Sequence, residues 1–115
     1  MTKKTDRSRA RSAARLAAVQ ALYQQEMEGT PMPKLLTEFH NHRLGATIDD
    51  VEYVDAEASF FDDVVTGVEA RRTELDGLIA DRLAAGWTMD RLDRPMRQIL
   101  RAGAYELIAR PDVPV

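Results

Sequence analysis

The chain contains no cysteine in 115 residues, and only 6% of its residues are aromatic. The lack of cysteine excludes disulfide bonds and thiolate metal sites, and it is compatible with a reducing cytoplasm. The longest nearly apolar run, residues 16–22, contains Gln20 and is far shorter than the roughly 20 residues that cross a bilayer. The N-terminus has no apolar signal-peptide core. We therefore expect a soluble cytoplasmic protein without a membrane anchor.

Motifs of catalytic and cofactor sites are also missing. The sequence has no nucleophile motif, glycine-rich phosphate loop or cofactor fingerprint. His40 and His42 are two residues apart, so on a helix they point to different sides, and no carboxylate stands at ligand spacing. The adjacent aspartates at 49–50 and 62–63 diverge likewise and form no acid–base dyad. We predict no catalytic residue, no metal site and no cofactor.

Helical patterns fill most of the sequence. Glycine and proline residues separate segments rich in Ala, Leu, Glu and Arg, and no segment alternates like a strand. The patterns predict helices over about 8–28, from Thr30–Pro31 to a stop at Gly45, from about 56, around 75–83, and over about 94–109. The length fits one domain with one core. The sequence thus predicts an all-α fold of about five helices, in a single domain over residues 1–115.

The spacing of apolar residues predicts which helix faces are buried. The acidic stretch 49–57 is expected to be an exposed loop, and Gly67 and Gly77 each mark close packing or a boundary. Trp87 is expected in a turn after Gly86. The predicted inward residues are Leu16, Val19, Tyr23 and Met27; Leu35, Leu36 and Phe39; Phe60, Phe61, Val64, Val65 and Val68; Leu75, Leu78, Ile79 and Leu83; and Met96, Ile99, Leu100, Gly103 and Leu107.

Charge is distributed unevenly along the chain. The first fifteen residues carry six basic side chains and one acid, Asp6, although the whole chain has a net charge of −3. Arginines at 7, 11 and 15 are four residues apart and share a helix face, where they suit phosphates and unpaired bases. A frayed, solvated tail is the alternative. The basic set Lys3, Lys4, Arg7, Arg9, Arg11 and Arg15 favours nucleic-acid binding over that alternative.

A second basic stripe lies in the last predicted helix. Arg94, Arg97 and Arg101 occupy positions i, i+3 and i+7, away from the expected apolar face. They could extend the basic track of residues 1–15. They could equally form surface salt bridges with Asp90, Asp93 or Glu106, which contribute little to stability. The residues alone leave both interpretations open.

Several motifs in order resemble one family. These are the arginine-rich start leading into AVQALY (18–23), LDGL (75–78), ILRAGAYEL (99–107) and DVP (112–114). Together they resemble the NusB family of transcription antitermination factors. The resemblance covers nearly the whole chain and implies an all-helical fold of two packed helical subdomains.

The resemblance also implies a function and its residues. Members bind boxA-type single-stranded RNA together with NusE, a small-subunit ribosomal protein, and the complex joins RNA polymerase and favours read-through, notably in ribosomal RNA operons. Family RNA contacts fall on Arg7, Arg9, Arg11 and Arg15 and, on the last helix, on Arg94, Arg97 and Arg101. Tyr23 matches a tyrosine near the NusE interface, while Met96 replaces an acidic residue of some relatives.

The resemblance further implies that the C-terminal helices are missing here. In the family, about two more helices follow the Asp-Val-Pro turn, with an Asn-Glu motif and a Phe-Val-Asn-Gly-Val-Leu motif that this chain lacks. Uncovered apolar faces would then favour a homodimer. Two alternative functions stay open: the RNA-targeting domain of a ribosomal RNA cytosine methyltransferase, and a general polyanion or membrane-surface binder.

Overall fold

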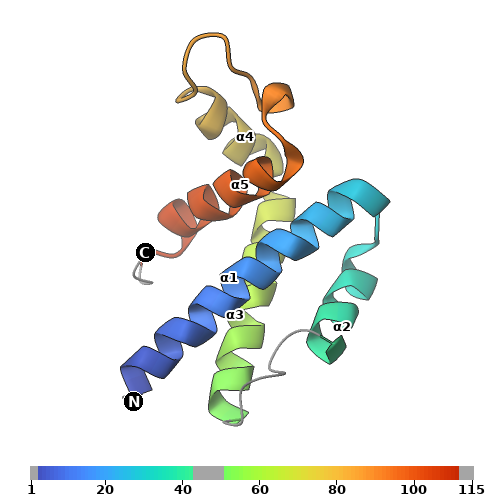
Figure 1. Ribbon diagram of the computed structural model, residues 1–115, viewed down its shortest axis with the longest axis vertical. Helices are drawn as coiled ribbons and strands as arrows, with labels where there is room; N and C mark the ends of the chain where they lie inside the picture. The colour runs from blue at the N-terminus through green and yellow to red at the C-terminus, as the bar shows by residue number, and fades with distance from the viewer. Residues whose placement is uncertain (1–2, 43–50, 112–115) are drawn as a thin grey trace.

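The protein is all-helical (Figure 1), as predicted. The computed structural model describes residues 3–42 and 51–111. Its elements are α1 (Lys3–Glu28), α2 (Met32–His42), α3 (Val51–Ala70), α4 (Arg72–Ala80), the 3-10 helix η1 (Met89–Arg91) and α5 (Arg94–Ala109). These residues include no strand, and none of their helices is both long and apolar enough to cross a membrane.

The crossing of α1 and α3 is the centre of the fold (Figure 1). The stripe predicted on α3 is confirmed, because Phe60, Phe61 and the three valines that follow are at most 5% exposed. On α1 the buried face consists mainly of alanines instead of the large residues that we expected. It is formed by Ala10, Ala14, Ala17, Ala18, Ala21 and Leu22.

The predicted inward face of α1 is therefore wrong. Leu16, Tyr23 and Met27 are exposed and Val19 is only partly buried. The alanines let the α1 backbone lie close to α3, whose phenylalanines and valines fill the space between the helices. The spacing of apolar residues assigned the large side chains of α1 to the core. The close approach of α1 to α3 buries the alanine face instead.

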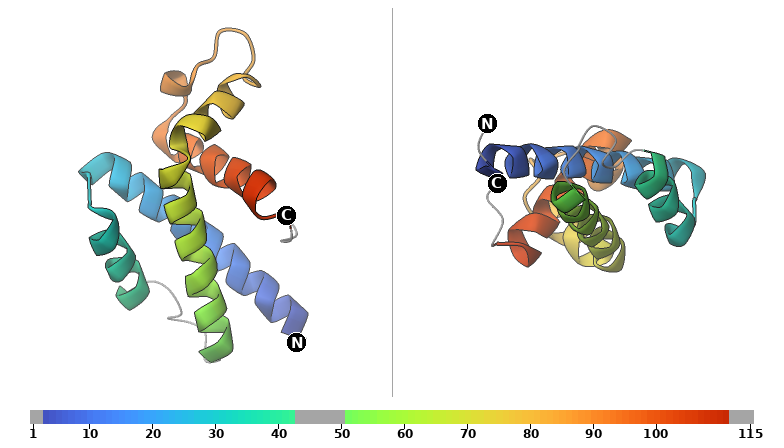
Figure 2. Two further views of the ribbon diagram at one scale, coloured as in Figure 1. Left: turned by 180° about the vertical axis from the view of Figure 1, so that it is seen from behind. Right: turned by 90° about the horizontal axis from the view of Figure 1, so that it is seen from below.

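Helix α2 packs beside α1 and α3 and is shown from behind in Figure 2. Gly29 ends α1 in the left-handed region, with φ of 69°, and its N–H donates to the Gln25 carbonyl at 2.8 Å. This is the C-cap geometry that glycine adopts without strain. Leu35 and Phe39 of α2 are buried as predicted, and Phe39 stacks on Phe61 with ring centroids 5.4 Å apart.

The acidic stretch before Phe60 is helical where it is described, so the prediction of a loop is wrong for residues 51–57. Helix α3 already begins at Val51, and Glu57 is buried. Glu57 lies three and four residues before Phe60 and Phe61, so a continuous helix places it on their face. Residues 49 and 50 and the expected stop at Gly45 lie outside the described residues.

Helix α4 and the turn after it agree with prediction in part. Leu75 and Ile79 are buried, whereas Leu78 and Leu83 are only partly buried and Leu83 lies beyond the helix. Trp87 is exposed in the turn after Gly86, as expected. Gly67 marks close packing, because a Cβ there would lie 2.2 Å from the Tyr105 ring, while a Cβ on Gly77 would meet open space.

Helix α5 has the predicted bounds, but the face that was predicted to be buried is turned outward. Met96, Ile99, Gly103 and Leu107 are exposed, with Leu107 at 66%, and Leu100 is half-buried. The inward face consists of Gln98, Arg101, Ala102, Tyr105 and Glu106. The predicted inward face is thus wrong, because polar side chains of α5 pair with carboxylates and arginines of α1, α3 and α4.

Candidate nucleic-acid interface

The basic residues predicted on the first helix lie on α1. Arg9 is exposed, and Arg11 and Arg15 are half-buried beside the alanine face. The Nε atom of Arg11 is buried without a hydrogen-bond partner. Lys3, Lys4 and Arg7 lie on the first turns, where the structure describes the helix but not the side chains. The helix therefore begins earlier than residue 8, and the basic segment is part of it.

Arg15 is held by α5. Its Nε donates to both carboxylate oxygens of Glu106, at 2.9 and 3.0 Å, and its Nη2 lies 2.9 Å from Oε1. The guanidinium carbon also lies 5.6 Å from the centroid of the Phe60 ring, within the range of a cation–π contact. The edge and the face of this guanidinium are thus both in contact with the protein.

Arg110, at the end of α5, belongs to the same cluster and was missed from the sequence. Its guanidinium carbon lies 5.4 Å from the Phe60 centroid, and its Nη1 donates to Asp63 at 2.8 Å. Asp63 also accepts a 2.6 Å hydrogen bond from the Tyr105 hydroxyl. No local signal could reveal this grouping, because Arg15 and Arg110 are brought together only by the packing of α5 on α1 and α3.

The arginines predicted as a second stripe contact the protein's own carboxylates. Arg101 is buried and makes two hydrogen bonds to Asp76, at 2.7 and 2.9 Å, which raise its pKa. Arg97 donates to Glu26 at 3.2 Å, and its side chain is 15% exposed. These partners lie on α4 and α1, not at the positions 90, 93 or 106 considered from the sequence.

Arg94 differs from the other two arginines of the stripe. Its side chain is 53% exposed, and its Nε lies 3.6 Å from a Glu26 oxygen. Its Nη1 contacts the Met27 sulfur at 2.8 Å. Carboxylates thus engage all three arginines, but only Arg94 presents most of its side chain at the surface.

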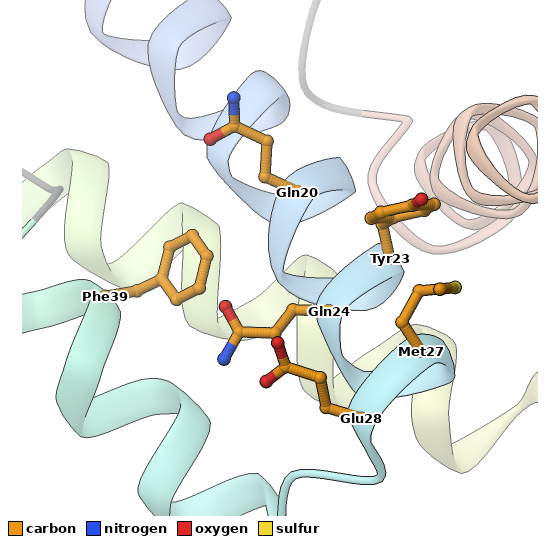
Figure 3. A pocket seen from close by; sticks show the side chains of 6 residues that line it. All are labelled: Gln20, Tyr23, Gln24, Met27, Glu28 and Phe39. Atoms are coloured by element: carbon orange, nitrogen blue, oxygen red, sulfur yellow. The ribbon is translucent and has the colours of Figure 1, made fainter.

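Tyr23 lies beside a shallow cavity between α1 and α2 (Figure 3). Gln20, Gln24, Met27 and Glu28 line the same cavity with Tyr23, and Phe39 of α2 closes its far side. Gln24 and Glu28 extend toward Phe39, whereas Tyr23 and Met27 extend away from it (Figure 3). Tyr23 and Met27 are both exposed. With Arg94 in contact with Met27, they form a surface that combines an aromatic ring, a thioether and a cation, which we call the Tyr23 surface.

The histidines and paired aspartates do not converge. His40 Nε2 lies 2.6 Å from Asp62, while Asp63 contacts Tyr105 and Arg110, so the two aspartates diverge as predicted. The side chain of His42 lies outside the described residues. In the described ranges, no group of three or more His, Asp or Glu side chains could hold a metal ion.

Comparison with known proteins identifies the family. The NusB family model matches residues 12–115. The chain is 67% identical over 109 residues to the transcription antitermination protein NusB of Sphingopyxis alaskensis, covering 95% of this chain and 73% of that protein. It is 69% identical over 107 residues to the protein of the same name from Novosphingobium aromaticivorans, covering 93% and 72%. The chain therefore belongs to the NusB family.

Proposed function

We propose that this chain is a transcription antitermination factor that acts by binding RNA and not by catalysis. It binds boxA-type single-stranded RNA together with the ribosomal protein NusE, and this assembly joins elongating RNA polymerase in the cytoplasm and favours read-through, notably in ribosomal RNA operons. High similarity to two proteins named transcription antitermination protein NusB supports the antitermination role.

The observation that carries the RNA-binding proposal is the surface of α1. Arg9 is exposed and Arg11 and Arg15 are partly exposed on one helix of an otherwise acidic protein. One guanidinium group can donate hydrogen bonds to two phosphate oxygens at once, and it can stack on an unpaired base. Both interactions suit single-stranded RNA. We assign Lys3, Lys4 and Arg7 to the same interface because they precede these arginines on α1.

We propose different roles for the three arginines of α5 that were predicted to contact RNA. Arg101 is buried against Asp76, so its donors serve the fold, and Arg97 is mostly covered beside Glu26. Arg94 keeps enough exposed surface to reach a ligand. We therefore propose the α1 arginines as the principal RNA contacts, with Arg94 as a contact to RNA or to the protein partner.

For NusE we propose the Tyr23 surface. Exposed tyrosine and methionine side chains suit the centre of a protein interface, because they bury large areas without leaving a charge unpaired. The acidic remainder of the chain complements a basic ribosomal protein and would accelerate their encounter. Met96 is exposed on α5, two residues beyond Arg94.

The test is a titration of the chain into labelled boxA-type RNA and into a shuffled RNA, with and without NusE, at two salt concentrations. Neutralising about four phosphates of a single strand gives a logarithmic salt slope of about −3. We expect preference for boxA RNA, tighter binding with NusE and weaker binding at high salt. Equal weak binding to both RNAs, unaffected by NusE, would contradict the proposal.

A further inference from the structure

Arg15 differs from the other described arginines of α1 in how firmly it is held. Its Nε and Nη2 engage both oxygens of Glu106 at 2.9 to 3.0 Å. This forked geometry fixes the plane of the guanidinium as well as its position. The Arg15 side chain is 28% exposed, whereas that of Glu106 is 11% exposed, so the carboxylate lies beneath the guanidinium.

The Phe60 ring restrains the same group from a second direction. Phe60 is buried, and the Arg15 guanidinium carbon lies 5.6 Å from its centroid. Arg9, by contrast, is exposed on α1. A free arginine side chain has large rotamer entropy, and ordering it on a ligand weakens binding. Arg15 is already ordered before any ligand arrives.

We propose that Glu106 is a positioning residue for RNA binding, acting through Arg15. Glu106 on α5 and Phe60 on α3 orient the guanidinium so that its exposed part meets an RNA phosphate without further ordering. Preorganisation of this kind raises affinity by lowering the entropic cost of binding. The inference rests on the proposed RNA-binding function and adds a residue that itself repels RNA.

Because Glu106 repels RNA, a positioning role and a purely electrostatic effect predict changes of opposite direction in RNA affinity when Glu106 is replaced. Glu106 carries a negative charge beside the proposed interface, so by charge alone its removal would tighten RNA binding by about twofold at low salt. If Glu106 positions Arg15, its removal weakens binding instead, because the guanidinium loses its orientation. Loss of one charge-assisted contact corresponds to roughly tenfold in affinity.

The experiment measures affinity of the full chain for boxA-type RNA, without NusE, for wild type and Glu106→Gln. We expect the variant to bind about tenfold more weakly, with a salt slope smaller by about 0.7. Glu74→Gln is the matched control, because it removes the same charge from a forked pair with Arg71 that lies outside the proposed interface. We expect Glu74→Gln to bind RNA as tightly as wild type.

Two further variants separate positioning from folding. Arg15→Lys keeps the charge and leaves Glu106 with a cation, but it loses the forked contact, so we expect weaker RNA binding in a folded protein. In an Arg15→Ala background, Glu106→Gln should cause no further loss of affinity. Circular dichroism and thermal unfolding check that each variant is folded.

The outcomes distinguish a failure of the proposed RNA-binding function from a failure of the positioning role of Glu106. A wild-type chain that binds no RNA would overturn the proposed function itself. A wild-type chain that binds RNA, with Glu106→Gln binding equally or more tightly, would overturn the positioning role alone. The same holds if Arg15→Lys binds like wild type, because orientation of the guanidinium would then be irrelevant.

Discussion

The arginines of α1 and those of α5 have similar spacing in the sequence and different surroundings in the structure. Arg9 is exposed and Arg11 is half-buried beside the alanine face of α1, while Arg97 and Arg101 face carboxylates on other helices. The comparison teaches that a basic stripe indicates a binding face only where its side chains stay exposed: Arg15 keeps 28% of its side chain exposed beside Glu106, against 15% for Arg97 and 9% for Arg101. On α5, the neighbouring helices α1 and α4 supply Glu26 and Asp76.

The largest effect that this comparison predicts is on stability. Replacing Arg101 with alanine leaves Asp76 without its two hydrogen bonds and opens a space at a buried site. Breaking one side of such a pair costs about 3 kcal/mol in the free energy of unfolding. Chemical denaturation measures the loss. An unfolding midpoint equal to that of wild type would show that Arg101 does not serve the fold.

The next prediction concerns how α5 is attached to α3. Tyr105→Phe removes the 2.6 Å hydrogen bond to Asp63 and should lower the free energy of unfolding by about 1.5–3 kcal/mol. The control is Tyr23→Phe, whose ring is exposed and which should leave stability within about 0.5 kcal/mol of wild type.

The same tyrosine gives stability a pH dependence. Burial, and then the bond to Asp63, raise the pKa of Tyr105 from 10.0 to about 12. The neutral phenol is favoured in the folded state, so its stabilisation is complete below pH 10 and is lost as pH rises toward about 12. In this pH window the free energy of unfolding should fall less steeply with rising pH for Tyr105→Phe than for wild type. Parallel curves would contradict the assignment.

On α1 the expected effect is on RNA and not on stability. Arg11→Ala should lower the magnitude of the salt slope for boxA-type RNA by about 0.7, because one phosphate contact is lost. Its unfolding free energy should stay within about 0.5 kcal/mol of wild type, since the side chain is partly exposed. An unchanged slope would remove Arg11 from the interface.

The smallest predicted effect concerns the outer face of α5, where Ile99 and Leu107 are exposed. Exposed apolar faces favour self-association. The homodimer predicted from the sequence would therefore form through this face. Light scattering across a concentration series should show less association for Leu107→Gln than for wild type, with little change in stability. Association that is unaffected by this substitution would assign any dimer to another surface.

The sequence predicted the helices well because their signals are local. Asp93 caps the N-terminus of α5, where its side chain accepts a hydrogen bond from the Met96 N–H at 2.9 Å, and Gly29 ends α1 with a positive φ. Capping residues and terminators act within a few positions, so their geometry can be inferred without knowing the rest of the fold.

The buried faces of α1 and α5 could not be predicted in the same way. Alanine contributes little to an apolar stripe, so the face that packs on α3 was assigned to the exposed side chains of Leu16 and Met27. On α5, Arg101 and Glu106 are buried only because Asp76 and Arg15 face them from distant positions. A pattern within one helix holds no information about such partners.

The most direct test compares matched pairs of arginines on the two helices. We would measure the salt slope for boxA-type RNA with the double variants Arg9→Ala/Arg11→Ala and Arg94→Ala/Arg97→Ala, which remove the same charge. We predict that the α1 variant lowers the magnitude of the slope by about 1.4, and that the α5 variant lowers it by at most about 0.7, the share of Arg94. An unchanged slope for the α1 variant, with the larger loss in the α5 variant, would contradict the account.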